Sequence, residues 1–223
     1  HALNSHRRTT MTNRRRAQVA SRKQPQQARS TELVAAILDA AAQVLADKGA
    51  TRFTTARVAE RAGVSVGSVY QYFPNKAAIL FRLQVDEWMQ TTRMLRSILE
   101  DAGTPHLERV RALVHTFLRS ECDEAEVRSA LHDVAPLYRD HPEAREARAE
   151  GDQMIAAFMM EALPEAPASV RELAGDLIFT TLGAVGSSFS QTRRTDAEIA
   201  AYADAMADMF CAYLASVEGT SFR

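Results

Sequence analysis

The sequence predicts an all-α protein, in which a small N-terminal helical domain precedes a larger helical bundle. Only 9 Gly and 7 Pro occur in 223 residues, which leaves few turn signals for the many short strands of a β protein. Apolar residues recur three and four positions apart through most of the chain, and no segment shows the strict alternation of a strand. A hydrophobic content of 46% is sufficient for a buried core.

Charge divides the chain into two unlike parts. Residues 1–76 contain 13 Lys and Arg against 4 Asp and Glu, whereas residues 77–223 contain 14 against 24. A basic first third indicates a polyanionic partner for that part alone. Residues 1–30 hold eight of these cations and no acid, so we expect a flexible arm there. Met11 is a candidate native start, and residues 1–10 are then expected to be partly vector-derived.

Residues 31–76 are expected to form a domain of three short helices. The first, over 31–48, has apolar residues at helical spacing and stops at Gly49. The second runs from about Thr54, a natural N-cap, to residue 62, and Gly63 makes the turn after it.

The third helix and those that follow are placed by their caps and by proline. Ser65 caps a helix that ends near Phe73, because Pro74 disfavours helical geometry in the residue before it. Asn75 then caps a long helix that reaches about residue 100. Residues 77–223 are expected to form one further domain, with helices at about 106–121, 124–139, 143–163, 168–190 and 196–217.

The third helix carries the surface that indicates a function. Val64, Val69 and Phe73 are spaced to face the other two helices. A helix that enters the major groove of DNA needs small residues at its N-terminal end and polar or aromatic ones beyond it. The outward side has that character: it presents Val66, Gly67, Tyr70 and Gln71, with Ser68 and Tyr72 at the flanks.

This segment resembles the DNA-binding signature of the TetR family of repressors, from about residue 34 to residue 80 without a gap. Beyond it, the chain resembles the family only in length, helix count and character. The matching elements are Ile37-Leu38-Asp39-Ala40-Ala41, Gly49, Thr54-Thr55, Val58-Ala59, Ala62-Gly63-Val64-Ser65, Tyr70, Tyr72-Phe73, Asn75-Lys76 and Leu80.

The resemblance implies a set of phosphate contacts. Thr54 and Thr55 would use backbone N–H groups and hydroxyls at the start of the positioning helix. Tyr70 and Tyr72 would place their hydroxyls on phosphate, although Tyr72 is also a candidate core aromatic. Lys76 would add a cation at the start of the next helix.

The resemblance also implies a set of base contacts, formed by Ser65, Val66, Gly67, Ser68 and Gln71. Family members often carry a basic residue at the positions of Val66 and Gln71, and this chain does not. Readout would then rely on thymine methyl groups and on Gln71.

Affinity would also draw on the basic arm, with Arg15 or Arg16 in a minor groove. An arm that stays disordered on DNA is the alternative. Arg57 and Arg61 are interpreted as solvated surface charges in preference to base readers.

The remaining helices are expected to sense a small, largely hydrophobic effector, again by resemblance. An apolar wall with polar handles suits such a ligand, and methionine and phenylalanine make the wall adaptable. The alternative for each member is plain core packing. The candidate lining residues are Trp88, Met94, His115, Phe117, His132, Tyr138, Met154, Phe158 and Phe179.

The last two helices are expected to pair with their symmetry mates in a homodimer, with packing inside one subunit as the alternative. Small residues at Ala174, Gly183, Ala184 and Gly186 would allow helices to approach closely. Two apolar stripes accompany them, Leu173, Leu177, Leu182, Val185 and Phe189 in one helix and Tyr202, Met206, Met209, Phe210 and Tyr213 in the other.

No catalytic or metal-binding motif is found in the sequence, so we expect neither an enzyme nor a cofactor. Isolated Cys122 and Cys211 suit a reducing cytoplasm, and no apolar stretch is long enough to span a bilayer. Together with the resemblance to the TetR family, the sequence predicts a cytoplasmic, dimeric repressor that binds double-stranded DNA at a palindromic operator and is released by an effector. The alternative is a helical small-molecule binding protein with a vestigial helix-turn-helix. Activation in place of repression depends on where the operator lies.

Overall fold

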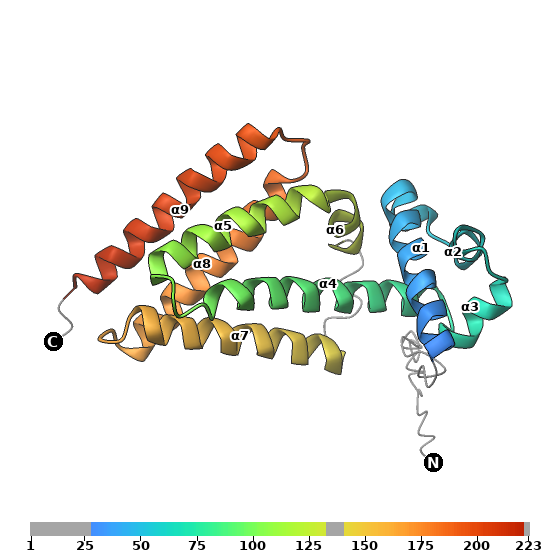
Figure 1. The fold of residues 1–223 in the computed structure, drawn as a ribbon, viewed down its shortest axis with the longest axis horizontal. Helices are drawn as coiled ribbons and strands as arrows, with labels where there is room; N and C mark the ends of the chain where they lie inside the picture. The colour runs from blue at the N-terminus through green and yellow to red at the C-terminus, as the bar shows by residue number, and fades with distance from the viewer. Residues whose placement is uncertain (1–27, 133–140, 221–223) are drawn as a thin grey trace, which may run out of the picture.

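The computed structural model describes residues 28–132 and 141–220, and this part of the chain confirms the predicted all-α fold (Figure 1). It contains nine helices and no strand. None of these helices is both long and apolar enough to cross a membrane. The helices are α1 Ala28–Arg52, α2 Thr55–Ala62, α3 Val66–Tyr72, α4 Lys76–Leu99, α5 His106–Asp123, α6 Ala125–His132, α7 Pro142–Ala162, α8 Ala168–Phe189 and α9 Asp196–Glu218.

The N-terminal helices begin where the sequence places their caps. The Arg57 backbone N–H donates to Thr54 Oγ1 at 3.3 Å, ahead of α2, and the Ser68 N–H donates to Ser65 Oγ at 3.0 Å, ahead of α3. Asn75 Oδ1 likewise accepts from the first turn of α4, at 2.9 Å. Each cap satisfies a backbone donor that the helix leaves unpaired, which fixes where the three helices start.

One expected helix end differs in the structure, and another cannot be compared. The chain leaves helical geometry at Gly49, with φ 70° and ψ 170°, and a further short helical stretch then continues α1 to Arg52. The positive φ explains why glycine stands there. The helix expected over 124–139 is seen as α6, and its last part lies outside the described residues.

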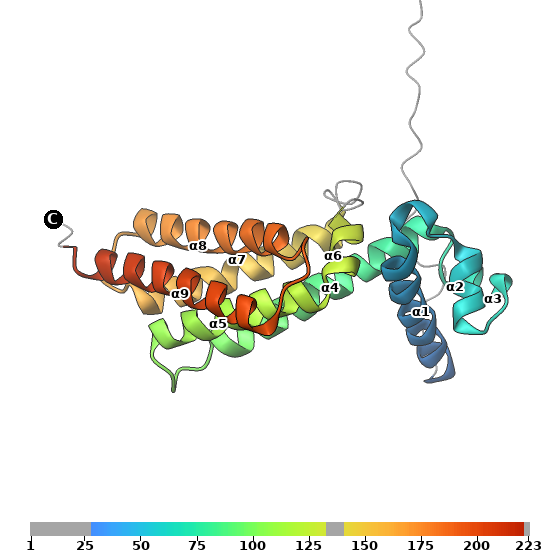
Figure 2. The ribbon, with the colours of Figure 1, turned by 90° about the horizontal axis from the view of Figure 1, so that it is seen from above.

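The helices form a small head and a longer body. Figures 1 and 2 show α1–α3 gathered at one end, with α4 leaving them and running into the bundle of α5 and α7–α9. Within the body, α4 packs on α5 and α7, and α5 packs along α9. The short helix α6 packs against α1, so it lies where head and body meet.

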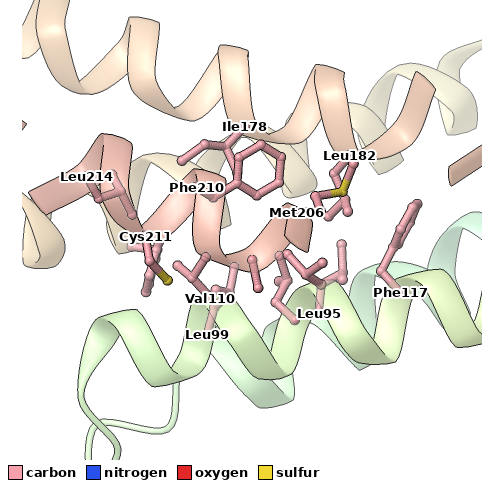
Figure 3. Packing of buried hydrophobic residues seen from close by; sticks show 14 of the residues in the cluster. Leu95, Leu99, Val110, Phe117, Ile178, Leu182, Met206, Phe210, Cys211 and Leu214 are labelled. Carbon is pink, nitrogen blue, oxygen red and sulfur yellow. The ribbon is translucent and has the colours of Figure 1, made fainter. Parts of the chain in front are cut away.

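Two clusters of buried side chains correspond to these parts. The body cluster joins α4, α5, α7, α8 and α9, and Figure 3 shows Ile178 and Leu182 of α8 facing Met206 and Phe210 of α9. The head cluster joins α1–α3 to the first turns of α4, and it also includes Ala130 and Leu131 of α6 and Ala144 of α7. The domain boundary after residue 76 stays a prediction, and the head packs on more of the chain than that boundary encloses.

Candidate nucleic-acid interface and sensor cavity

The turn between α2 and α3 is fixed by Gly63. Its backbone lies in the left-handed region, with φ 68° and ψ 30°, and its N–H donates to Glu60 O at 3.2 Å. The next N–H, of Val64, donates to Ala59 O at 3.0 Å. Glycine adopts this conformation with little strain, so the sharp turn that sets α3 across α2 follows from the sequence.

The outward side of α3 is the side that the sequence predicts. Val69 is fully buried and Phe73 is almost so, and both belong to the head cluster. Val66 and Tyr70 are 39% and 41% exposed. Gly67 and Gln71 are also exposed and Ser68 is half-buried. The helix therefore presents a surface that is small at its start and aromatic and polar beyond.

Two expected phosphate-contacting side chains are buried instead. Tyr72 is 9% exposed and its ring belongs to the head cluster, because it lies one turn from Val69 on the same face of α3. Thr55 is 7% exposed, since it shares the inward face of α2 with Val58 and Ala59. At Thr55 the backbone N–H remains as the candidate DNA donor.

The other candidate DNA contacts lie at helix starts. Thr54 and Ser65 are exposed N-caps, and the Ser65 and Ser68 hydroxyl oxygens lie 2.8 Å apart. Lys76 is exposed as the first residue of α4. A cation at a helix N-terminus interacts unfavourably with the helix dipole, so Lys76 does not stabilise the start of α4.

Arg57 and Arg61 make surface contacts within the head. The Arg61 guanidinium lies 2.7 Å from Asp47 Oδ2 and donates to Gln43 Oε1 at 3.1 Å, both on α1. Arg57 donates to the backbone carbonyl of Arg52. These contacts agree with the interpretation of both residues as surface charges.

Two of the nine sensor candidates, Trp88 and Phe117, line one cavity. It has a volume of about 180 Å³ and lies among α4, α5, α6 and α8. Trp88 is also packed against the head cluster, and Phe117 belongs to the body cluster. The other lining residues are Gln84, Glu87, Glu121, Arg128, Leu131, Gly183 and Ser187.

The remaining candidates do not gather there. Phe179 lines a separate groove of about 590 Å³ between α7 and α8, while Met94, Met154 and Phe158 are part of the body cluster or packed on it. His115 lines neither of these two: its Nε2 lies 2.9 Å from Asp204 Oδ1 on the surface where α5 meets α9, and a ligand contact there stays a prediction. The side chain of His132 and all of Tyr138 lie outside what the structure describes.

The charged residues of the cavity were not among the expected ones. Arg128 of α6 reaches Glu87 of α4 at 3.2 Å, Glu124 at 3.0 Å and also Glu121 of α5. It donates to Ser120 Oγ at 2.8 Å as well. Burial raises the pKa of the Glu87 carboxyl, and the nearby guanidinium opposes this without cancelling it. The signal in the sequence was a polar residue, Glu87 or Gln84, within an otherwise apolar helix face.

The expected dimer stripes divide into an exposed and a buried part. Leu173, Leu177, Tyr202 and Met209 are exposed. The remaining large apolar members are wholly or partly buried within the subunit: Leu182, Val185, Phe189, Met206, Phe210 and Tyr213.

The expected small-residue stripe divides in the same way. A Cβ on Gly186 would lie 2.8 Å from Phe117 Cε1, so this glycine serves contact between α8 and α5. Ala174 is buried within the subunit, Ala184 is exposed, and Gly183 lines the cavity beside Phe117.

The head defines the class of the protein, a transcriptional regulator with a DNA-binding helix-turn-helix. Residues 37–83 match the family model for bacterial regulatory proteins of the tetR family. Residues 105–217 match the model for a tetracyclin repressor-like C-terminal domain. The chain belongs to the TetR family of transcriptional regulators.

Relatives of known name resemble one part of the chain. Nucleoid occlusion factor SlmA of Vibrio campbellii is 39% identical over 84 residues, which are 37% of this chain and 42% of SlmA. The fatty acid metabolism regulator protein of Bacillus subtilis is 32% identical over 68 residues, or 30% of this chain and 35% of that protein. The matches therefore span less than half of each relative.

Solved structures resemble most of the chain in fold. The fatty acid degradation regulator FadR of Bacillus halodurans superposes with a TM-score of 0.61 at 22% identity, covering 85% of this chain and 96% of that one. A TetR-family regulator from Mesorhizobium loti gives 0.65 at 18%, covering 84% and 98%. FadR of Bacillus subtilis, in complex with stearoyl-CoA, gives 0.60 at 18%, covering 79% and 97%.

Proposed function

We propose that this regulator is a repressor that binds a palindromic operator as a homodimer and leaves it when a small-molecule effector binds. The observation that carries this proposal is the outward surface of α3, defined by Val66, Gly67, Tyr70 and Gln71. These side chains are exposed on a helix whose other side is anchored in the head cluster. A fixed helix with a free, small and polar face suits the major groove.

Each exposed side chain of α3 has a role that fits its chemistry. The Gln71 amide can donate to and accept from adenine, and Val66 can contact a thymine methyl group. Ser65, Ser68 and the backbone of Gly67 complete the base-facing set. The phosphate-facing set consists of Thr54, the Thr55 N–H, the Tyr70 hydroxyl and Lys76, while Tyr72 is buried in the head cluster.

The dimer is proposed to form through the outer faces of α8 and α9. Leu173 and Leu177 of α8 and Tyr202 and Met209 of α9 are large apolar side chains left exposed in one subunit. The Tyr202 ring stacks on Phe189 with centroids 4.3 Å apart, which ties the exposed stripe of α9 to the end of α8. Burying such a face against a second copy is favourable. A two-fold dimer then presents two α3 helices to an inverted repeat.

Effector binding is proposed to reach the head through α4 and α6. Leu131 of α6 lines the cavity and also belongs to the head cluster, while Arg128 of the same helix lies among the cavity carboxylates. A ligand that displaces α6 therefore acts on the packing of α1. It releases DNA only if it binds the DNA-incompetent arrangement more tightly than the competent one. The complex of the similarly folded Bacillus subtilis FadR with stearoyl-CoA supports a small-molecule effector in general.

The variant Gln71→Ala tests the reading surface. We expect it to weaken binding to the preferred duplex by about 1–3 kcal/mol, the size of one good base contact, without changing the helical circular dichroism signal. Gln90→Ala is the matched control, because Gln90 is also an exposed helical glutamine but lies on α4, outside the head. Fluorescence anisotropy on labelled duplex measures both. Equal affinities for the two variants would contradict the assignment of α3.

The lack of a basic residue at Val66 and Gln71 favours a second candidate function, a small-molecule binding protein with a vestigial helix-turn-helix. The salt dependence of DNA affinity distinguishes the two candidate functions. A DNA-binding head loses affinity steeply with rising salt, because each neutralised phosphate releases counterions. Absent or salt-insensitive binding would favour the vestigial head.

A further inference from the structure

The cavity among α4, α5, α6 and α8 combines an apolar wall with buried charge. Trp88, Phe117 and Leu131 supply the apolar part. Its volume of about 180 Å³ compares with the ~150 Å³ of an apolar protein cavity that holds one benzene ring. A ligand of this cavity therefore has about one ring and a short substituent.

Acidic side chains exceed basic ones at the polar end of the cavity. Glu87 and Glu121 both line it, with side chains 17% and 9% exposed, and both pair with Arg128. Glu124 pairs with the same guanidinium from outside the cavity, where it is 40% exposed. One cation thus serves three carboxylates. The raised pKa of Glu87, caused first by burial, indicates that its charge is incompletely compensated.

The amide of Gln84 provides an independent sign of a missing ligand. Gln84 is 4% exposed and lines the cavity. Its Nε2 donates a hydrogen bond to Glu87 Oε2 at 3.2 Å. A carboxylate oxygen can only accept, so the amide nitrogen must face Glu87, and the amide oxygen Oε1 takes no part in this contact. Oε1 has no hydrogen-bond partner in the described part of the chain. A buried carbonyl oxygen without a donor is costly, and an N–H group in the cavity would satisfy it.

We propose that this cavity binds a small organic ammonium ion, a protonated primary or secondary amine that carries one aromatic or short apolar group. Its charge faces Glu87 and Glu121, and one N–H donates to Gln84 Oε1. Its apolar group lies against Trp88 and Phe117, whose ring faces also attract cations. This assignment rests on the proposed function, because it treats the cavity as the effector site and names the chemical class that the site selects.

Tryptophan fluorescence reports binding directly, because Trp88 is the single tryptophan of the chain and lines the cavity. The full-length protein is titrated at neutral pH with 2-phenylethylammonium. Two comparison ligands keep the ring and change the charge, neutral 2-phenylethanol and anionic phenylacetate. Saturable binding of the ammonium is expected, about tenfold or more tighter than that of the alcohol, with phenylacetate weakest. Calorimetry repeats each titration without relying on Trp88.

Three variants assign the contacts. Glu121→Gln is expected to weaken ammonium binding about tenfold and to leave binding of the alcohol unchanged. Glu124→Gln is the matched control, because it removes the same charge from the same arginine outside the cavity, and it is expected to retain the wild-type affinity. Gln84→Leu is expected to weaken the ammonium severalfold by removing the acceptor. Retained Trp88 emission shows that each variant is folded.

The proposal is overturned if the ammonium does not bind, if the alcohol or phenylacetate binds as tightly, or if Glu124→Gln loses as much affinity as Glu121→Gln. DNA binding without ligand is measured on the same samples. Sequence-specific DNA binding together with failure of the ammonium would reject only the ligand class. If the wild-type protein shows no sequence-specific DNA binding, the proposed function is rejected instead.

Discussion

Gly67 lies on the exposed side of α3, where a Cβ would meet only Ser65 Oγ, at 3.7 Å. Its backbone φ is not positive, so the subunit itself does not require glycine there. Alanine would even favour the helix. The absence of a side chain is thus explained by what the helix approaches, which in the proposed function is DNA.

Gly67→Ala is expected to raise the free energy of unfolding by about 0.5–1 kcal/mol while lowering operator affinity. Gly151→Ala is the control, because Gly151 also has open space in a helix but lies on α7 in the body. It should give the same gain in stability with unchanged affinity. Urea unfolding and anisotropy measure the two quantities. Unchanged operator affinity in Gly67→Ala would show that DNA does not come close at this position.

Glu87 gives a pH-dependent prediction. Its folded-state pKa is raised above the ordinary 4.5, so its ionised form destabilises the fold at neutral pH, and this cost disappears as pH falls towards 4.5. Glu87→Gln removes the charge at every pH. Its unfolding free energy relative to wild type is therefore expected to be higher at pH 7 than at pH 5, as measured by urea unfolding. A pH-independent difference would contradict the raised pKa.

At the scale of elements, the starts of α2, α3 and α4 could be predicted because each depends on one local cap, Thr54, Ser65 or Asn75. The neighbours of a helix could not, because the same apolar spacing serves a core, a dimer or a pocket. Gly186 fits the small-residue stripe expected at a dimer interface. Its closeness to Phe117 of α5 shows that it serves packing within the subunit. His115 likewise pairs with α9, a contact 89 residues away in sequence. Such distant pairings leave no local pattern.

Gly186→Ala tests the close approach of α8 to α5. The new Cβ would lie 2.8 Å from Phe117 Cε1 and 3.2 Å from Glu121 Cγ, so we expect a loss of about 1–2 kcal/mol in unfolding free energy through overpacking. Gly183→Ala is the control one turn earlier, where a Cβ meets nothing within 4 Å. It should leave stability equal or slightly higher, by up to about 1 kcal/mol. Equal effects of the two substitutions on thermal or urea unfolding would be incompatible with this packing.

For the whole molecule, the cavity and the head that carries the α3 surface are joined by two helices. The head cluster takes residues from α4 and α6, and both helices also line the cavity. A cavity ligand and an operator can therefore bias the same packing from opposite sides. In the proposed dimer, both heads would act on one DNA site, so operator affinity is expected to depend on dimerisation.

Leu177→Arg tests the proposed dimer face. Leu177 is 46% exposed on α8, and a charge there is expected to shift the protein from dimer to monomer and to lower operator affinity. Met89→Arg is the control, since Met89 is 45% exposed on α4. Sedimentation equilibrium measures the mass of each variant. A Leu177→Arg dimer as stable as the control would move the interface elsewhere.

The central claim is that the α3 surface reads a specific DNA sequence in a dimer. Selection of the full-length protein against random duplex DNA at near-physiological salt tests it most directly. We predict recovery of one preferred site made of two inverted half-sites, spaced by about one helical turn or a multiple of it. Recovery of no preferred sequence would contradict the claim, and would leave the cavity as the functional part of the molecule.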